Sequence, residues 1–285
     1  AAIKNIFEYE DIKKQLHDIK PIVAILLKHN VEPVGIVCDT ILASYLLNPN
    51  SPDYSIERLM QEYNPPKFEL AENAPELAKE SAEISALSEA LIKLIEEKEQ
   101  TKLLNEIEIP LAIVLADMEN CGFMADRNGI MEYNKEISAR LDEITKEIYD
   151  TVGYEFNINS PKQLGSALFE KLALPHGKKT KSGYSTSAEV LESLKYEHPA
   201  VALILQYRTY SKLKSTYCDG LLKVIGEDGR IHSSFNQTET RTGRISSTEP
   251  NLQNIPVRTE LGRELRRFFI AKDGCVLVDA DYSQI

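Results

Sequence analysis

A polar stretch at residues 242–256 carries side chains that are well suited to bind a ligand. It holds the guanidinium of Arg244, the side-chain amides of Asn251, Gln253 and Asn254, and several hydroxyls. Burying so many polar groups is costly, and these residue types do not favour a helix. The stretch therefore predicts a surface loop that forms hydrogen bonds with a polar ligand.

A second candidate group is the carboxylate of Asp281. The mostly apolar residues 276–280 before it predict a buried strand that delivers this carboxylate at its end. Carboxylate oxygens are the ligands that Mg²⁺ prefers, and Mg²⁺ usually keeps substrate phosphates in its shell. Asp279 lies on the same face of such a strand, and we expect it to be a neighbouring polar group rather than a ligand. The residue types alone leave open that Asp281 only ends the strand.

Length and composition predict a globular protein. The chain has 285 residues, enough for about two domains. No apolar run reaches the roughly 18 residues that a membrane span needs, and the N-terminus lacks the pattern of a secretory signal. The four cysteines form no CxxC pair, which argues against a zinc site and favours reduced thiols. We therefore expect a cytoplasmic protein without a membrane partner.

The net charge of −11 is unevenly distributed along the chain. Residues 1–157 contain 15 Lys and Arg against 30 Asp and Glu, whereas residues 158–272 contain 18 against 11. An acidic half followed by a basic half indicates that the second half meets phosphate, although a chance imbalance on solvated faces explains the counts equally well.

The predicted helix at residues 199–224 carries cations without acidic neighbours. Arg208, Lys212 and Lys214 lie within two turns, and no acidic residue occurs in this helix before Asp219. Arg208 and Lys212 are four residues apart and share a face. Uncompensated cations of this kind bind phosphate, although a solvated charged face is the commoner arrangement on helices.

Periodicity and capping residues predict a mostly helical chain with few strands. Asp126 and Thr186 or Ser187 are expected N-caps, and Pro161 and Pro199 are expected first helical positions. The apolar residues of 127–151 from Ile130 to Ile148 are spaced close to a heptad seam. The expected helices lie at residues 1–30, 40–47, 55–63, 76–108, 110–120, 127–151, 161–171 and 199–224. The expected strands lie at residues 34–39, 230–236 and 276–281. One strand in the first hundred residues is too few for a sheet, so this region resembles part of a larger unit.

Five motifs in order make the sequence resemble the bacterial family A DNA polymerases. These motifs occupy residues 156–164, 183–187, 212–217, 242–256 and 281–285. Residues 39–47 add a weaker resemblance to the 3′–5′ exonuclease-like domain of the same enzymes. The resemblance implies an α+β fold that is mostly helical. Its expected parts are an incomplete, ribonuclease H-like exonuclease domain at residues 1–103, a helical thumb at residues 104–225 and the first strands of an antiparallel palm at residues 226–285.

The resemblance also implies nucleotide transfer onto a primer 3′-hydroxyl, with primer–template DNA and dNTPs as partners. Asp281 resembles the first of two metal-binding aspartates, with the backbone carbonyl of Tyr282 on the same metal, and two Mg²⁺ ions are expected in the complete enzyme. Arg244 resembles the residue that reaches the minor groove at the primer end, where the acceptors of all base pairs occupy similar positions. The other expected contacts are Asn251, Gln253 and Asn254 to the duplex, Arg208, Lys212, Lys214 and Thr216 to the DNA backbone, and Arg258 to the incoming triphosphate.

Two departures from the family change these expectations. The positions that align with acidic metal ligands of the exonuclease carry Ile22 and Ser81 instead, and Leu77 stands where a tyrosine is expected. The nearby acids that could replace them are Asp18, Glu80 and Glu83. We expect a dead exonuclease site that survives as a structural support, with Asp39 in a structural role.

The second departure is that the resemblance stops within the palm. One catalytic carboxylate cannot hold two metal ions, so we expect this chain alone to bind no Mg²⁺ and not to polymerise. We expect the parent enzyme to be a monomer and to be located at the bacterial nucleoid in the cytoplasm. Two alternatives remain open, a duplex DNA-binding module without catalysis and an active 3′–5′ exonuclease.

Overall fold

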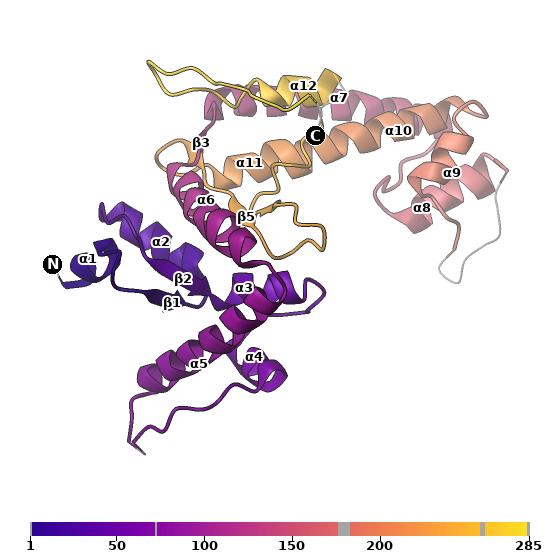
Figure 1. Ribbon diagram of the computed structural model, residues 1–285. Helices are drawn as coiled ribbons and strands as arrows, with labels where there is room; N and C mark the ends of the chain where they lie inside the picture. Colours follow the sequence, from indigo (N-terminus) through magenta and orange to yellow (C-terminus); the bar gives the residue numbers. More distant parts are fainter. Residues whose placement is uncertain (1, 72, 176–182, 257–259, 284–285) are drawn as a thin grey trace. The chain divides into compact units, whose positions relative to one another are not determined.

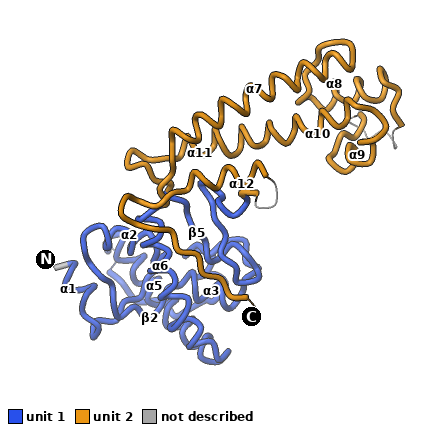
Figure 2. The backbone as a smooth tube through the Cα atoms, turned by 90° about the horizontal axis from the view of Figure 1, so that it is seen from above, with its two compact units in different colours: residues 1–122, 232–254 blue, residues 123–231, 255–285 orange. Residues whose placement is uncertain are grey.

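The protein folds into helices with a few short two-stranded sheets, as predicted (Figure 1). The computed structural model describes residues 2–71, 73–175, 183–256 and 260–283. Two compact units divide the chain, with residues 1–122 and 232–254 in unit 1 and residues 123–231 and 255–285 in unit 2 (Figure 2). The three domains expected from the family resemblance have different boundaries from these two compact units, and the division into three domains stays a prediction. No helix among the described residues is long and apolar enough to cross a membrane.

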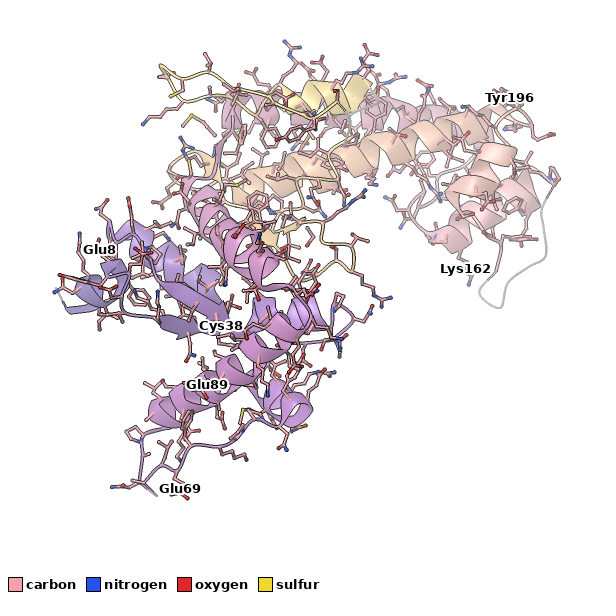
Figure 3. All side chains as sticks on the ribbon, viewed as in Figure 1. Glu8, Cys38, Glu69, Glu89, Lys162 and Tyr196 are labelled. Carbon is pink, nitrogen blue, oxygen red and sulfur yellow. The ribbon has the colours of Figure 1, made fainter. Side chains whose placement is uncertain are left out.

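The first part of unit 1 packs helices around a small parallel sheet. Its elements are α1 (Ala2–Glu8), β1 (Lys14–Leu16), α2 (Ile19–Lys28), β2 (Ile36–Asp39), α3 (Thr40–Leu47), α4 (Ile56–Tyr63), α5 (Glu76–Glu97), the π-helical η1 (Leu103–Glu108) and α6 (Ile109–Cys121). Leu87, Leu91 and Ile95 recur every four residues on α5 and are buried in the core of the unit, because this spacing places them on one helix face. Cys38 of β2, labelled in Figure 3, lies in the same core.

Two expectations for this region are wrong. The continuous helix over residues 1–30 is interrupted by β1, which pairs with β2 in parallel because Lys14 is buried and its ammonium donates a 2.7 Å hydrogen bond to the carbonyl of Val34. The continuous helix over residues 76–108 is interrupted after α5, where Glu99 has a left-handed φ of 58°. In both places tertiary contacts override the local propensity.

The second part of unit 1 is an antiparallel pair of strands. The strands are β5 (Ser234–Asn236) and β6 (Ser246–Thr248), and Phe235 lies opposite Ser247. The loop between them, residues 237–245, contains Arg244. The expected strand at residues 230–236 is therefore present as two short pieces, since β4 (Arg230–Ile231) pairs separately with β3 (Phe123–Met124) in unit 2.

Unit 2 is built on two long helices that pack against each other, α7 (Arg127–Val152) and α10 (Pro199–Lys212). Its remaining elements are α8 (Pro161–Gly165), the π-helical η2 (Ser166–Lys171), α9 (Ala188–Ser193), the π-helical η3 (Leu213–Cys218), α11 (Asp219–Val224) and α12 (Glu260–Arg266). Ile130, Ile137 and Ile144 form the predicted heptad seam of α7 and are buried.

The starts of these helices confirm the capping predictions. The carboxylate of Asp126 accepts a 3.0 Å hydrogen bond from the backbone N–H of Gly129, at the start of α7. The hydroxyl of Ser187 caps α9 in the same way. Pro161 and Pro199 stand at the first positions of α8 and α10, where a missing N–H costs nothing.

The expected strand at residues 276–281 is not observed. Val276 and Val278 are 81% and 85% exposed, and this segment pairs with no other strand among the described residues. An apolar, β-favouring sequence forms a strand only where a second strand satisfies its backbone groups. The residue types at 276–281 favour a strand, but the prediction of a strand there is wrong.

Candidate nucleic-acid interface

Arg244 is exposed on the loop between β5 and β6. The loop holds its backbone, since the hydroxyl of Thr240 donates a 2.7 Å hydrogen bond to the carbonyl of Arg244. No residue in the described ranges forms an ion pair with the Arg244 guanidinium. The side chain is therefore available to a ligand while its backbone is fixed.

Two serine hydroxyls hold the segment around β6 in place. The Ser233 hydroxyl donates a 2.8 Å hydrogen bond to the carbonyl of Pro250, and the Ser247 hydroxyl accepts one of 2.9 Å from the N–H of Leu252. Both serines are buried. Not every polar group of residues 242–256 faces a ligand, because Ser247 serves the fold instead.

The three amides of the stretch form a preorganised turn. The side-chain carbonyl of Asn251 accepts hydrogen bonds from the N–H groups of Gln253 and Asn254, at 3.0 and 3.2 Å, which is an Asx turn. The Gln253 amide donates a 2.8 Å bond to the carbonyl of Ile245, next to Arg244. All three amide side chains are exposed. The Gln253 side chain thus lies against the backbone next to Arg244, and the shared binding surface stays a prediction.

The cations of α10 and η3 in unit 2 fall into two classes. Arg208 is partly buried, and its guanidinium donates to the carbonyl and the hydroxyl of Thr186. Burial lowers the pKa of Arg208 below its ordinary value. Lys214 forms an ion pair of 3.0 Å with Asp219. Both cations therefore already have partners within the chain.

Lys212 is the cation of the second class, and the hydroxyl of Thr216 lies near it along the chain. Both side chains are exposed, and Lys212 has no ion-pair partner within the described part of the chain. Lys212 ends α10 and Thr216 lies one turn later in η3. Of the three expected phosphate-binding cations, Lys212 is the one whose charged group has neither an ion pair nor a hydrogen bond among the described residues.

Asp281 and Tyr282 are exposed and belong to unit 2, whereas Arg244 belongs to unit 1. No group of three or more His, Cys, Asp or Glu side chains among the described residues is arranged to hold a metal ion. The residues described here therefore do not fit a complete metal centre, although Asp281 offers one carboxylate. The prediction for Arg258 lies outside the described residues.

Asp39 and Ser81, two residues of the exonuclease-like region, form hydrogen bonds within the fold. The Asp39 carboxylate accepts hydrogen bonds from the N–H groups of Leu42, at 2.8 Å, and Ile19, at 2.6 Å, so it caps α3 as a structural residue. Burial raises the pKa of Asp39 to about 6. The Ser81 hydroxyl donates a 2.7 Å bond to the carbonyl of Leu77 within α5.

The sequence gives no signal for a group of anchoring residues on the helices of unit 1. Lys20 and Glu119 form an ion pair of 2.6 Å, and both also bind the backbone of Phe235 in β5. The hydroxyl of Tyr45 donates a 2.7 Å hydrogen bond to the carbonyl of Thr240. Contacts between residues so far apart in the chain leave no local pattern.

Known proteins resemble the chain over nearly its whole length. The family model for DNA polymerase family A matches residues 127–285, and that for the ribonuclease H-like domain of DNA polymerase I matches residues 1–73. DNA polymerase I of Bacillus subtilis (strain 168) is 41% identical and aligns with 100% of this chain and 34% of the relative. DNA polymerase I of Geobacillus stearothermophilus is 43% identical, over 97% of this chain and 34% of the relative.

One solved structure has a similar fold. It is the POL domain of Pol1 from M. smegmatis in complex with DNA primer-template and dNTP. That protein is 35% identical, with a TM-score of 0.83, and the match covers 96% of this chain and 48% of that one. The chain spans about a third of the length of the curated relatives it matches. More than half of its residues match the polymerase family model, and the chain belongs to the family A DNA polymerases.

Proposed function

We propose that this chain is part of a DNA-dependent DNA polymerase that extends a primer 3′-hydroxyl with dNTPs. Its own role is to grip the primer–template. The family match supports this role, and so does the similar POL domain, whose structure contains primer-template and dNTP. The observation that carries the proposal is the exposed guanidinium of Arg244 on a loop whose backbone is held in place.

Arg244 reaches the minor groove at the primer end. Acceptors of all four base pairs occupy similar positions there, so a guanidinium checks the shape of a pair without reading sequence. Asn251, Gln253 and Asn254 extend this surface along the duplex. The Asx turn and the bond from Gln253 to Ile245 reduce the entropy lost when these amides bind.

The helical region of unit 2 binds the DNA backbone. Lys212 is the main cation of this surface, because its ammonium is exposed and engaged by no described residue. Thr216 adds a hydroxyl that can donate to a phosphate oxygen. Lys214 contributes less while it is paired with Asp219, and Arg208 acts mainly by holding Thr186.

The complete enzyme uses divalent cations, which we propose are Mg²⁺, and Asp281 with the carbonyl of Tyr282 supplies one part of their site. Further carboxylates are required, because the described residues contain no group of three potential ligands. This chain alone therefore binds primer–template without extending it. Arg258 approaches the incoming triphosphate.

The exonuclease-like region does not cleave DNA. The buried carboxylate of Asp39 uses both oxygens to accept backbone hydrogen bonds, which leaves it committed to the fold. Ile22 and Ser81 offer no carboxylate where the family places ligands, and Leu77 replaces a tyrosine. This region, at residues 1–103, supports the thumb and the palm at residues 104–225 and 226–285 in a monomeric enzyme of the bacterial cytoplasm.

Binding and activity assays on the same primer–template test the proposal. Fluorescence anisotropy is expected to show binding that weakens about tenfold in Arg244→Ala, the effect of losing one charged contact. Arg58→Ala removes the same charge from α4, where Arg58 is paired with Glu62, and is expected to leave the affinity unchanged. No primer extension and no shortening of a labelled 3′ end are expected with Mg²⁺ or Mn²⁺.

Each outcome separates the alternatives. Equal affinity of wild type and Arg244→Ala would overturn the proposed contact. Shortening of the 3′ end that disappears in Glu83→Ala would establish the exonuclease alternative instead. If a preparation that includes the remainder of the polymerase gains no extension activity, the chain is a DNA-binding module without catalysis.

A further inference from the structure

Side chains from the helices of unit 1 bind β5, which pairs only with β6 among the described residues. Phe235, the middle residue of β5, donates its N–H to the carboxylate of Glu119 at 2.7 Å. Its carbonyl accepts a hydrogen bond of 2.7 Å from the ammonium of Lys20. Lys20 and Glu119 lie on α2 and α6, and their 2.6 Å ion pair joins the two side chains to each other.

This ion pair acts on β5 as a neighbouring strand would, because it offers one donor and one acceptor to the same residue. The two side chains are only 19% and 20% exposed, so water screens the pair less than a surface pair. Charge-assisted hydrogen bonds are shorter and stronger than neutral ones. They fix β5 against α2 and α6.

Two further contacts continue along the chain from β5 toward Arg244. The amide of Gln237 donates to the carbonyl and the carboxylate of Glu108, at 3.1 and 2.8 Å. The hydroxyl of Tyr45, on α3, donates a 2.7 Å bond to the carbonyl of Thr240. Thr240 in turn donates its hydroxyl to the carbonyl of Arg244. Tyr45 is therefore joined to the Arg244 backbone through a single residue.

Apolar packing alone does not set the position of this segment. A partly open pocket of about 440 Å³ is lined by helix residues that include Ile41, Leu42 and Ala112 and by Phe235 and Gln237 of the β5 segment. A dense core resists displacement, but side chains that line a pocket have more room to move. The polar contacts are the ones that define where the loop lies.

We infer that Tyr45 is a positioning residue for Arg244, and that the exonuclease-like region aids DNA binding by holding the β5–β6 loop rather than by touching DNA. Tyr45 itself is only 4% exposed, so it has no surface to offer a duplex. The inference rests on the proposed function, because the position of Arg244 matters only if Arg244 contacts DNA.

The test compares two tyrosine-to-phenylalanine variants of the whole chain. Tyr45→Phe removes only the hydroxyl that binds Thr240. Tyr54→Phe is the matched control, because the Tyr54 hydroxyl donates a 2.9 Å bond to the carbonyl of Asn48, outside the loop. The two rings lie 6.3 Å apart in the same unit. Affinity for primer–template is expected to fall about fivefold in Tyr45→Phe, the factor that loss of one ordinary hydrogen bond gives, and to stay unchanged in Tyr54→Phe.

A double-mutant cycle separates positioning from general destabilisation. In an Arg244→Ala background, Tyr45→Phe is expected to have no further effect on affinity, because the group it positions is gone. Hydrogen exchange adds a readout without DNA. Backbone amides of residues 237–248 are expected to exchange faster in Tyr45→Phe and at the wild-type rate in Tyr54→Phe.

The outcomes distinguish this inference from the proposed function. Equal weakening by the two tyrosine variants, or an undiminished effect of Tyr45→Phe in the Arg244→Ala background, would overturn the positioning role. The proposed function fails separately if Arg244→Ala binds primer–template like the wild type. If hydrogen exchange in Tyr45→Phe is then also unchanged, Tyr45 does not hold the loop. If exchange is faster, Tyr45 anchors the β5–β6 loop but has no role in DNA binding.

Discussion

Lys214 and Asp219 form an ion pair of 3.0 Å, and Asn134 donates a second hydrogen bond of 2.8 Å to the same carboxylate. The carboxylate thus holds the lysine that the family resemblance assigns to the DNA backbone. Burial favours a higher pKa for Asp219, but the bonds from Lys214 and Asn134 outweigh it and lower this pKa below its ordinary value. The Asp219 carboxylate is therefore ionised at neutral pH and reduces the charge that Lys214 offers to phosphate.

The salt dependence of DNA binding is expected to distinguish Lys212 from Lys214. Lys212→Ala should reduce the slope of log affinity against log salt by about 0.9, because one phosphate contact releases about that number of counterions. Lys214→Ala should reduce it by less, since Asp219 already neutralises part of that charge. Anisotropy titrations at four salt concentrations measure both slopes. Equal reductions would show that Lys214 leaves Asp219 when DNA binds.

Arg208 is expected to matter more for stability than for charge. Arg208→Ala leaves the carbonyl and hydroxyl of Thr186 without their donor and should lower the free energy of unfolding by about 1–3 kcal/mol. Arg140→Ala is the control, because the ion pairs of Arg140 among the described residues are with exposed Glu143 and Glu147 on its own helix, and its loss should leave the stability almost unchanged. Urea unfolding measures both. A smaller loss in Arg208→Ala than in Arg140→Ala would contradict the structural role.

Substitution by alanine is expected to change the stability in opposite directions at two helical glycines, Gly262 and Gly220. In α12, a Cβ at Gly262 would overlap the backbone of Pro256, so Gly262→Ala should destabilise the protein by about 1–3 kcal/mol. In α11, a Cβ at Gly220 meets only the carbonyl of Ser215 at 3.7 Å, an ordinary contact. Gly220→Ala should therefore stabilise it by about 0.5–1 kcal/mol, because alanine is the better helix former. Midpoints of urea unfolding give both signs, and a stabilising Gly262→Ala would refute the overlap.

The stability of unit 1 is expected to depend on the protonation of Asp39. Burial raises the pKa of Asp39 from 3.8 to about 6, so the folded state holds this proton more tightly than the unfolded state does. The contribution of Asp39 to stability is then fully present below about pH 4 and is lost as pH rises toward 6. The Asp39→Asn side chain does not titrate. The excess free energy of unfolding of the wild type over this variant should therefore fall as pH rises from about 4 to 6. A carboxyl titration midpoint below 4, measured by NMR, would contradict the account.

Much of the fold follows from local signals in the sequence. Pro161, Ser187 and Pro199 mark helix starts because the cost or benefit of each is decided within one turn. The strand β1 is missed, since Lys14 favours a strand only through its burial and its contact with Val34. Residues 276–281 show the reverse case, in which a favourable sequence lacks a pairing partner.

The candidate site is predictable only in part for the same reason. Exposure of Arg244 and the turn at Asn251 follow from residue types and short spacings. The partners that change the roles of Arg208 and Lys214 depend on how helices and loops pack, as does the burial of Ser247. The bond from Tyr45 to Thr240 spans 195 positions and has no counterpart in any local pattern.

Hydroxyl-radical footprinting of a primer–template tests most directly whether Arg244 lies in the minor groove at the primer end. Hydroxyl radicals attack sugar hydrogens that line this groove, so a bound side chain leaves a protected patch. Wild-type protein is expected to protect the last few base pairs at the primer 3′ end, and Arg244→Ala is expected to lose that protection while phosphates near Lys212 stay covered. Identical protection by both proteins, or protection only at sites remote from the primer end, would contradict the account.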